Sequence, residues 1–363
     1  MDKPQDISGA KSSAESRSKT KIPFNANSVL LFLKNTFAST QNIIGIDIGS
    51  SYIKIAQLQK SPKGYAITNC ITRAIPSTVK ENSAEKRKII QEFIKQFIAD
   101  FRVKTKLGRI AIWGKGVYVF SISVPALLKK KDLKGAVSIE LKKRLPFQVD
   151  ISNVSFDFFV TGEISDEGGA SLVVTCIAVD QVRLDEETQF LKDLNIRPVT
   201  INVIPDALGN LLSFCVEGAA GKLIVLLELG ASNSMLNFYK GKILVFSREI
   251  PVGGEHLTHA LAKGIIIPGG TTNISIDDAE KIKRTCGISL EDKEKTEYLT
   301  DFGMLRGEQI SAMLRPILER LVIEVTRTLN YYIKTFKTPT NLIGELYLSG
   351  GASRLRNIDK FLL

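Results

Sequence analysis

The chain alternates between short apolar runs with the two-residue period of β-strands and longer stretches with the 3.6-residue period of helices. Strands are expected at 43–48, 52–59, 65–70, 108–113, 117–124, 154–161, 171–179, 199–204, 222–229, 233–240, 243–250 and 345–348. Helices are expected at 84–101, 130–144, 180–194, 206–215, 255–263, 276–285, 308–335 and 357–363. Strands that alternate with helices in two comparable halves predict an α/β fold.

The amino-terminal 41 residues carry a different pattern. Residues 1–27 are rich in Ser, Lys and acids and poor in large apolar side chains, so we expect a disordered tail. Residues 28–38 follow with a dense apolar stripe after Ser28, a suitable N-cap. This predicts a short helix docked on the body, because Lys34 is its sole cation, with a membrane-surface anchor as the alternative. The folded body should begin near Asn42.

The composition is that of a globular protein with a hydrophobic core. The 363 residues are 44% hydrophobic, with a mean hydropathy of +0.06. No apolar run approaches the roughly 18 residues that would cross a bilayer. The four cysteines contain no C-x-x-C pair, which argues against a structural zinc site and for a reducing cytoplasm.

The positive charge is concentrated in one window. Residues 80–144 hold 17 Lys and Arg against six acids, and this excess equals the net charge of +11 of the whole chain. Such a patch would suit an anionic membrane surface or an acidic protein. The alternative is a set of solvated helix faces kept soluble by lysine. Nucleic acid is disfavoured, because aromatic residues are not interleaved with the lysines.

One short pattern occurs twice, 181 residues apart. A strand ends at Asp47 and runs through Gly49 into two serines, and a second strand ends at Glu228 and runs through Gly230 into further small polar residues. The first hairpin continues to Lys54. Two matching hairpins, one in each half, suggest two similar domains that clamp one ligand between their turns.

These turns have the chemistry of phosphate and metal binding. Glycine lets the backbone approach a bulky anion, and successive N–H groups can then point at phosphate oxygens. A carboxylate such as Asp47 could hold a hydrated Mg²⁺ that bridges those phosphates. The alternative for either turn alone is a tight β-turn capped by its own polar side chains.

Two further motifs extend the pattern. A strand runs into Gly350 and Gly351 and then Ser353, where a diglycine would let a flat ring or a phosphate lie against the backbone, or where Ser353 would simply cap a helix. On a predicted helix, Glu280 and Lys283 share one face and could contact a ribose and an adenine. Their alternative role is a surface ion pair.

These motifs together resemble those of the actin-like ATPase superfamily, which includes actin, Hsp70, MreB and FtsA. The matching residues are Asp47 to Ser51 with Lys54, Glu228 to Ser234, Ala279 to Lys283, and Leu348 to Leu355. Within the superfamily the chain is most similar to the PilM family of type IV pilus assembly. Residues 139–147 and 246–258 carry the further likeness, which extends over about residues 42–363.

The resemblance implies an actin-like, duplicated ribonuclease H-like fold with an FtsA/PilM-type extra subdomain. The first subdomain would span 42–125 and be completed by about 205–219 and 344–363. The extra subdomain would span 126–204. The second half would span 220–343, with a small upper subdomain at about 258–303.

The resemblance also implies ATP with Mg²⁺ in the cleft between the halves. Asp47 and Glu228 would serve the metal. The other expected ligand contacts are Gly49, Ser50, Ser51 and Lys54 on one side of the phosphates, Gly230, Ser232 and Ser234 on the other, and Gly350, Gly351, Ser353, Glu280 and Lys283 around the adenosine. The family usually has Asp where this chain has Glu228. With no obvious general base, we expect slow ATP turnover or none.

The function implied by the resemblance is that of a cytoplasmic scaffold, peripheral to the inner membrane. Its expected partner is the cytoplasmic amino-terminal peptide of a PilN-like membrane protein, bound in a groove near 117–124 and 130–144. Other pilus alignment-complex proteins and further copies of the chain are also expected partners. The alternatives are an FtsA-like membrane-tethered filament and a small-metabolite kinase of the same superfamily. Because the family continues beyond the last motif, we expect the sequence to be truncated at Leu363.

Overall fold

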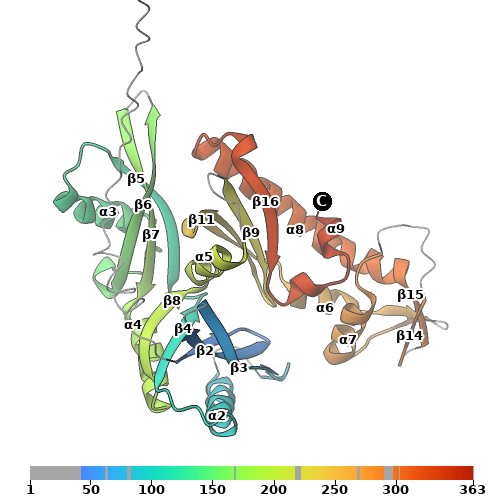
Figure 1. The fold of residues 1–363 in the computed structure, drawn as a ribbon. Helices are drawn as coiled ribbons and strands as arrows, with labels where there is room; N and C mark the ends of the chain where they lie inside the picture. Colours follow the sequence, from blue (N-terminus) through green and yellow to red (C-terminus); the bar gives the residue numbers. More distant parts are fainter. Residues whose placement is uncertain are drawn as a thin grey trace, which may run out of the picture.

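The computed structural model describes residues 42–61, 64–79, 83–166, 169–216, 222–267, 270–289, 297–301 and 303–362 (Figure 1). The expected disordered tail at 1–27 and the expected helix at 28–38 lie outside the described residues. Among the described residues, no helix is both long enough and apolar enough to span a membrane.

The first half is built on a five-stranded sheet with strand order β3-β2-β1-β4-β8. Its strands are β1 (Ile43–Ile48), β2 (Tyr52–Ser61), β3 (Gly64–Ala74), β4 (Leu107–Ile112) and β8 (Arg197–Val203). Two helices, α2 (Ala84–Asp100) and α4 (Gln181–Asp193), contribute to the core on one face of this sheet. That face receives the alternate residues of each strand, such as Ile44 and Ile46, which are almost fully buried. A further helix, α5 (Ile204–Cys215), connects the first half to the second.

The second half repeats the beginning of this topology with the strand order β11-β10-β9-β16. Its strands are β9 (Leu223–Leu229), β10 (Ser234–Lys240), β11 (Ile243–Ile250) and β16 (Ile343–Ser349). The resemblance placed 344–363 with the first subdomain, whereas β16 pairs with β9 and Leu355 and Ile358 pack in the core of the second half. In each half the first strand pairs antiparallel with the next and parallel with a later one, as β1 does with β2 and β4, and β9 with β10 and β16. The largest core lies between this sheet and α6 (Gly254–Ala262), α7 (Ile276–Cys286) and α8 (Gly307–Thr335).

A third unit, which we call the inserted subdomain, lies in the chain between β4 and α4. The expected bounds of 126–204 left out Val117–Pro125 and included α4 and β8, which belong to the first half. The inserted subdomain consists of β5 (Val117–Pro125), β6 (Val154–Asp166), β7 (Gly169–Asp180) and α3 (Lys130–Arg144), with the strand order β5-β7-β6. One face of this sheet packs on α3 through Ile122 and Val174. On the other face, Ser121 Oγ and Thr175 Oγ1 each donate a hydrogen bond of 3.1 Å to the Val245 carbonyl on β11. The inserted subdomain therefore contacts the second half directly.

The remaining elements are short. They are the strands β12 (Ile265–Ile267), β13 (Gly270–Thr272), β14 (Glu297–Thr300) and β15 (Gly303–Arg306), the helix α9 (Ile358–Phe361), and the 3₁₀ turns Ile151–Asn153, Thr340–Leu342 and Ala352–Arg354. The four strands form two separate hairpins that the sequence pattern did not predict. Strands of three or four residues are too short to establish a two-residue period.

Candidate functional site

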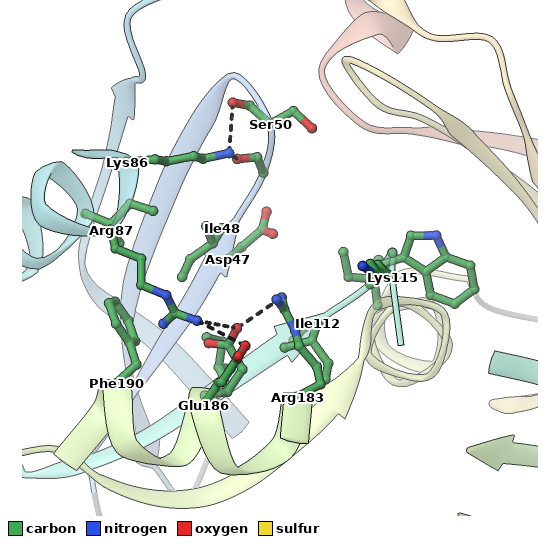
Figure 2. Close-up of a pocket in the computed structure, with 18 of the residues that line it drawn as sticks. Asp47, Ile48, Ser50, Lys86, Arg87, Ile112, Lys115, Arg183, Glu186 and Phe190 are labelled. Carbon is green, nitrogen blue, oxygen red and sulfur yellow. Dashed lines mark hydrogen bonds and ion pairs between the residues drawn. The ribbon is translucent and has the colours of Figure 1, made fainter. Parts of the chain in front are cut away.

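A cleft with a volume of about 1130 Å³ opens between the two halves. The β1–β2 turn lines it from the first half, and the β9–β10 turn lines it from the second. Its lower part extends over the carboxyl ends of β1 and β4 to α2 and α4, as Figure 2 shows. Ligands of open α/β sheets bind at this edge, beyond the carboxyl ends of parallel strands.

Most of the residues predicted for the ligand site line this cleft. They are Asp47, Gly49, Ser50, Ser51, Lys54, Glu228, Gly230, Ser232 and Gly351. The other predicted residues do not line it, and they are Ser234, Glu280, Lys283, Gly350 and Ser353. The structure therefore brings the two repeated turns to one cavity, while part of the predicted adenosine side lies next to it.

A buried lysine on α2 stabilises the first turn by binding two of its carbonyls. The Gly49 N–H donates to the Tyr52 carbonyl at 2.9 Å, which closes the hairpin. The Lys86 ammonium donates to the carbonyls of Gly49 (3.1 Å) and Ser50 (3.3 Å), and Figure 2 shows it reaching this turn from α2. Lys86 is only 4% exposed. Lys86 was not predicted as a site residue, although its spacing of four residues from Ile90 places it on the apolar face of its helix.

The second turn packs against the start of α6. The N–H groups of Gly254 and Glu255 donate to the carbonyls of Gly230 (3.0 Å) and Ala231 (2.8 Å). A Cβ atom at Gly253 would lie 2.4 Å from the Ala231 carbonyl oxygen, so this close approach requires glycine. Ser234, the third residue of this turn that was predicted to contact the ligand, is fully buried, and its hydroxyl donates to the Val252 carbonyl. Ser234 thus stabilises the turn rather than facing the cleft.

The two turns touch each other across the cleft. The Ser50 and Ser232 hydroxyls share a hydrogen bond of 2.9 Å, and the Ser51 hydroxyl donates to Glu255 Oε1 at 2.9 Å. This is a closed arrangement of the two halves. A phosphate group placed between the turns would take over these hydroxyls and part the Ser50–Ser232 pair.

Two carboxylates from opposite halves face the cleft. Asp47 Oδ2 accepts a hydrogen bond of 2.8 Å from the Lys54 ammonium, its partner in the β1–β2 register. Burial, together with the Asp47 charge, raises the pKa of Glu228 to about 7, and the Lys54 charge opposes the shift. Glu228 therefore gives up its proton near neutral pH, which makes it a carboxylate that a nearby cation would ionise.

This donor set fits a hydrated Mg²⁺ better than a metal caged by protein. Mg²⁺ in nucleotide sites usually keeps several waters and takes one or two carboxylates together with phosphate oxygens. Within the described part of the chain, no group of three or more His, Cys, Asp or Glu side chains could hold a metal ion alone. Asp47 and Glu228 are the carboxylates that would serve such an ion.

The diglycine after β16 forms the third side of the cleft. Gly350 has a φ of +87°, and a Cβ atom there would lie 2.3 Å from the Leu229 carbonyl oxygen and 2.8 Å from Glu228 Oε1. The Ser353 hydroxyl donates back to the Gly350 carbonyl at 2.7 Å. Gly351 lines the cleft, and no atom lies within 4 Å of where its Cβ would be. Gly350 therefore lets the chain pass close to β9, and Gly351 leaves open space beside it.

The predicted ribose and adenine contacts bond to each other on α7. The Lys283 ammonium donates to the Gly254 carbonyl (3.0 Å), to Thr258 Oγ1 (2.9 Å) and to Glu280 Oε2 (2.5 Å). These three bonds use all of its donors, and burial lowers its pKa. The other Glu280 oxygen accepts from Arg284 Nε at 2.8 Å. In this conformation Lys283 fastens α7 to α6, and only a rearrangement would free it for a ligand.

The lower part of the cleft lies where the first half meets the inserted subdomain. There Arg87 lies 3.7 Å from both Glu186 and Glu187, and Arg183 lies 3.0 Å from Glu187 (Figure 2). Val182, which also lines the cleft, is 67% exposed. These residues were not predicted from the sequence, because their pairing depends on two helices that are distant in sequence.

One acid connects the second turn to this lower region. Glu249 on β11 accepts from Asn233 Nδ2 at 2.5 Å and from the Trp113 indole N–H at 3.0 Å. Asn233 belongs to the β9–β10 turn, and Trp113 comes directly after β4, at the entrance to the inserted subdomain. Glu249 thus joins the second turn to the segment that leads into the inserted subdomain.

Comparison with known proteins agrees with this architecture. A family model described as type IV pilus assembly protein PilM matches residues 45–363. A solved structure described as a PilM-PilN type IV pilus biogenesis complex is 22% identical, with a TM-score of 0.67, over 89% of this chain and 87% of that chain.

Structures of MreB5 of Spiroplasma citri bound to AMPPNP and to ADP also match. Each is 14% identical, with a TM-score of 0.51, over 89% of this chain and 88% of the MreB5 chain. At this identity the likeness concerns the fold. The fold is that of the actin-like ATPases, as the sequence predicted.

Proposed function

Because the chain belongs to the PilM family of type IV pilus assembly proteins, we propose that it is a nucleotide-binding scaffold of the pilus assembly machinery. Its proposed place is the cytoplasmic face of the inner membrane. There it would bind the amino-terminal peptide of a PilN-like membrane protein and, through other surfaces, further alignment-complex proteins or copies of itself. The observation that carries the proposal is the cleft between two matching turns that offers Asp47 and Glu228 to one ligand.

The proposed nucleotide is ATP with Mg²⁺. The β1–β2 turn, with Gly49, Ser50 and Ser51, would bind the phosphates from one side. The β9–β10 turn, with Gly230 and Ser232, would bind them from the other. When bound, Mg²⁺ would neutralise phosphate charge beside the two carboxylates. Gly351 would border the adenosine, and Glu280 and Lys283 would join the site only if α7 moves away from α6.

Calorimetric titration of the full chain with ATP–Mg²⁺ tests the nucleotide site. We expect Asp47→Ala to weaken binding at least about tenfold, which corresponds to about 1.4 kcal/mol. The matched control is Asp100→Ala, which removes an exposed aspartate at the end of α2 and should leave binding unchanged. Binding of ATP–Mg²⁺ that is equally tight in the Asp47 variant would contradict the proposed site.

The resemblance placed the peptide groove near 117–124 and 130–144. The structure has its cleft beside these segments, lined by 113–116 and α4 and by no residue of either segment. The proposed peptide site is therefore the lower part of this cleft, where α4 borders the inserted subdomain. This region combines an exposed apolar side chain, Val182, with charges of both signs on Arg183 and Glu186. Such a surface can bind an extended peptide that carries both apolar and charged residues. The likeness to a PilM-PilN complex structure supports this class of partner.

Fluorescence anisotropy with a labelled amino-terminal peptide of a PilN-like protein tests the peptide site. Val182→Asp should weaken binding at least about tenfold, because it puts an unpaired charge where an apolar contact is proposed. The matched control is Ile323→Asp, which makes the same kind of change at an exposed site on α8. If Val182→Asp and Ile323→Asp bind the peptide with equal affinity, the peptide does not bind at the lower part of the cleft.

A further inference from the structure

Helix α3 and the residues that flank it form a surface that the proposed nucleotide and peptide sites do not use. We define this α3 surface as residues 127–147. The helix covers the face of the inserted sheet opposite the one that contacts β11, so its outer side points away from the rest of the molecule (Figure 1). Val137 and Leu141 bury its inner side, and Lys131, Ile139 and Lys142 lie on the outer side.

The α3 surface is strongly basic. It holds seven lysines and arginines against two acids. Lys143 and Arg144 are paired with Glu140, whereas the ammonium groups of Lys129, Lys130, Lys131 and Lys142 make no hydrogen bond or ion pair within the described part of the chain. Four ammonium groups are therefore available to an external partner.

Large apolar side chains project from the same surface. Leu127 is 98% exposed, Phe147 is 106% exposed and Ile139 is 62% exposed. Leu127 precedes the helix and Phe147 follows it. Single exposed apolar residues are ordinary, but three on one short basic segment mark a contact surface.

We propose that the α3 surface binds directly to an anionic lipid bilayer, with lysines at the head groups and with Leu127 and Phe147 inserted as apolar anchors. Each lysine near such a surface gains electrostatic attraction, and each buried apolar group adds to it. This contact does not depend on the nucleotide or the PilN-like peptide. It would orient the inserted subdomain toward the membrane.

The arrangement favours a bilayer over an acidic protein. Leu127 and Phe147 flank a helix of 15 residues, which is about 22 Å long. Anchors this far apart on a convex helix match a plane, whereas a small protein partner would need two separate pockets. The unpaired lysines between them match a continuous anionic surface better than a single acidic side chain.

Sedimentation of the full chain with vesicles tests the proposal. Vesicles of phosphatidylcholine with phosphatidylglycerol should bind the protein, and vesicles of phosphatidylcholine alone should bind it far less. The triple variant Lys129→Glu, Lys130→Glu, Lys131→Glu should lose about tenfold or more in vesicle affinity. The matched control reverses Lys95, Lys104 and Lys106, which are exposed lysines on α2 and in the loop after it, and should lose much less.

A second pair of variants tests the apolar anchors. Leu127→Ser with Phe147→Ser keeps every charge, and we expect it to weaken vesicle binding about tenfold, since two inserted side chains are lost. Both side chains are fully exposed, so these changes should leave the thermal unfolding midpoint unchanged. Residues 1–41 are common to all variants, so differences between them report the α3 surface.

Three outcomes would overturn the proposal. The first is an equal loss in the triple variant and its control, which would assign binding to net charge alone. The second is full vesicle binding by the serine variant, which would exclude insertion. The third is unchanged vesicle binding by the triple variant together with lost binding to a polyglutamate peptide, which would assign the lysines to an acidic protein partner.

Discussion

Glu228 is the residue at which the two matching turns differ most. It stands where the first turn has Asp47, and its side chain is one methylene longer. Its carboxyl is largely buried beneath Gly350, whose Cβ position is only 2.8 Å from Glu228 Oε1. Burial and the facing Asp47 charge raise its pKa from 4.5 to about 7. At neutral pH the Glu228 carboxyl is therefore partly protonated, so its side chain exchanges between a neutral and a negatively charged form.

This shift predicts a pH-dependent stability that Glu228→Gln would remove. The folded state binds the proton more tightly than the unfolded chain, so the stabilising contribution is complete below about pH 4.5 and is lost as the pH rises through about 7. The loss is on the order of 3 kcal/mol, since the pKa rises from 4.5 to about 7 and each pKa unit corresponds to about 1.4 kcal/mol. Thermal unfolding at pH 5 and pH 8 should show Glu228→Gln gaining stability relative to the unsubstituted protein as the pH rises.

The control for this prediction is Glu92→Gln, which changes an exposed glutamate on α2. It should follow the unsubstituted protein at both pH values. If the difference between Glu228→Gln and the unsubstituted protein is the same at pH 5 and pH 8, the proton is not bound where the geometry places it.

At the scale of single residues, the sequence predicted the side chains that are close to a turn in sequence. Asp47, Gly49, Ser50 and Gly230 follow directly from the repeated pattern. Lys86 was missed because its role comes from tertiary packing, which carries an ammonium from α2 to the carbonyls of a turn 36 residues earlier in the chain. Packing also decides the contacts of Ser234 and Lys283, whose hydrogen bonds are made within the protein in this conformation.

At the scale of elements, the longer strands and helices were predictable because each has one buried face. The expected helix at 308–335 compares with α8 at Gly307–Thr335, and the expected strand at 243–250 coincides with β11. The hairpins β12–β13 and β14–β15 were missed because strands of three or four residues leave no measurable period. The elements that build the cleft were therefore predictable from the sequence, and the two small hairpins were not.

Strand β11 connects parts of the molecule that no local pattern relates. Its Glu249 carboxylate binds Asn233 of the second turn and Trp113 before the inserted subdomain. Four residues earlier, the Val245 carbonyl accepts the two hydroxyls of the inserted sheet, Ser121 and Thr175. A shift of β11 would therefore reach both the cleft and the inserted subdomain, which is a physical route by which the proposed nucleotide and peptide sites would influence each other.

At the scale of the whole molecule, polar contacts hold the two halves together across the mouth of the cleft. Besides the serine contacts, Ser77 Oγ donates to Asp277 Oδ1 at 3.1 Å, and the Arg284 guanidinium bonds to the Tyr52 hydroxyl. The Arg284 guanidinium carbon also lies 5.5 Å from the centre of the Tyr52 ring. Polar contacts with solvent access are individually weak, so the closed arrangement should be easily reversed.

Arg284→Ala should shift the molecule toward an open cleft, because Arg284 bonds to Tyr52 of the first half and to Glu280 of α7 at once. We expect faster hydrogen exchange in the β1–β2 turn and in α7, with the exchange of β9 and β10 unchanged. The matched control is Arg356→Ala, which removes an arginine that bonds to the Tyr298 hydroxyl at 3.3 Å within the second half. If both variants change exchange in the β1–β2 turn equally, Arg284 does not keep the two halves closed. If only Arg284→Ala speeds exchange in the β1–β2 turn, closure depends on the Arg284 contact. ATP–Mg²⁺, which we propose binds between the two halves, should then restore slow exchange in that variant.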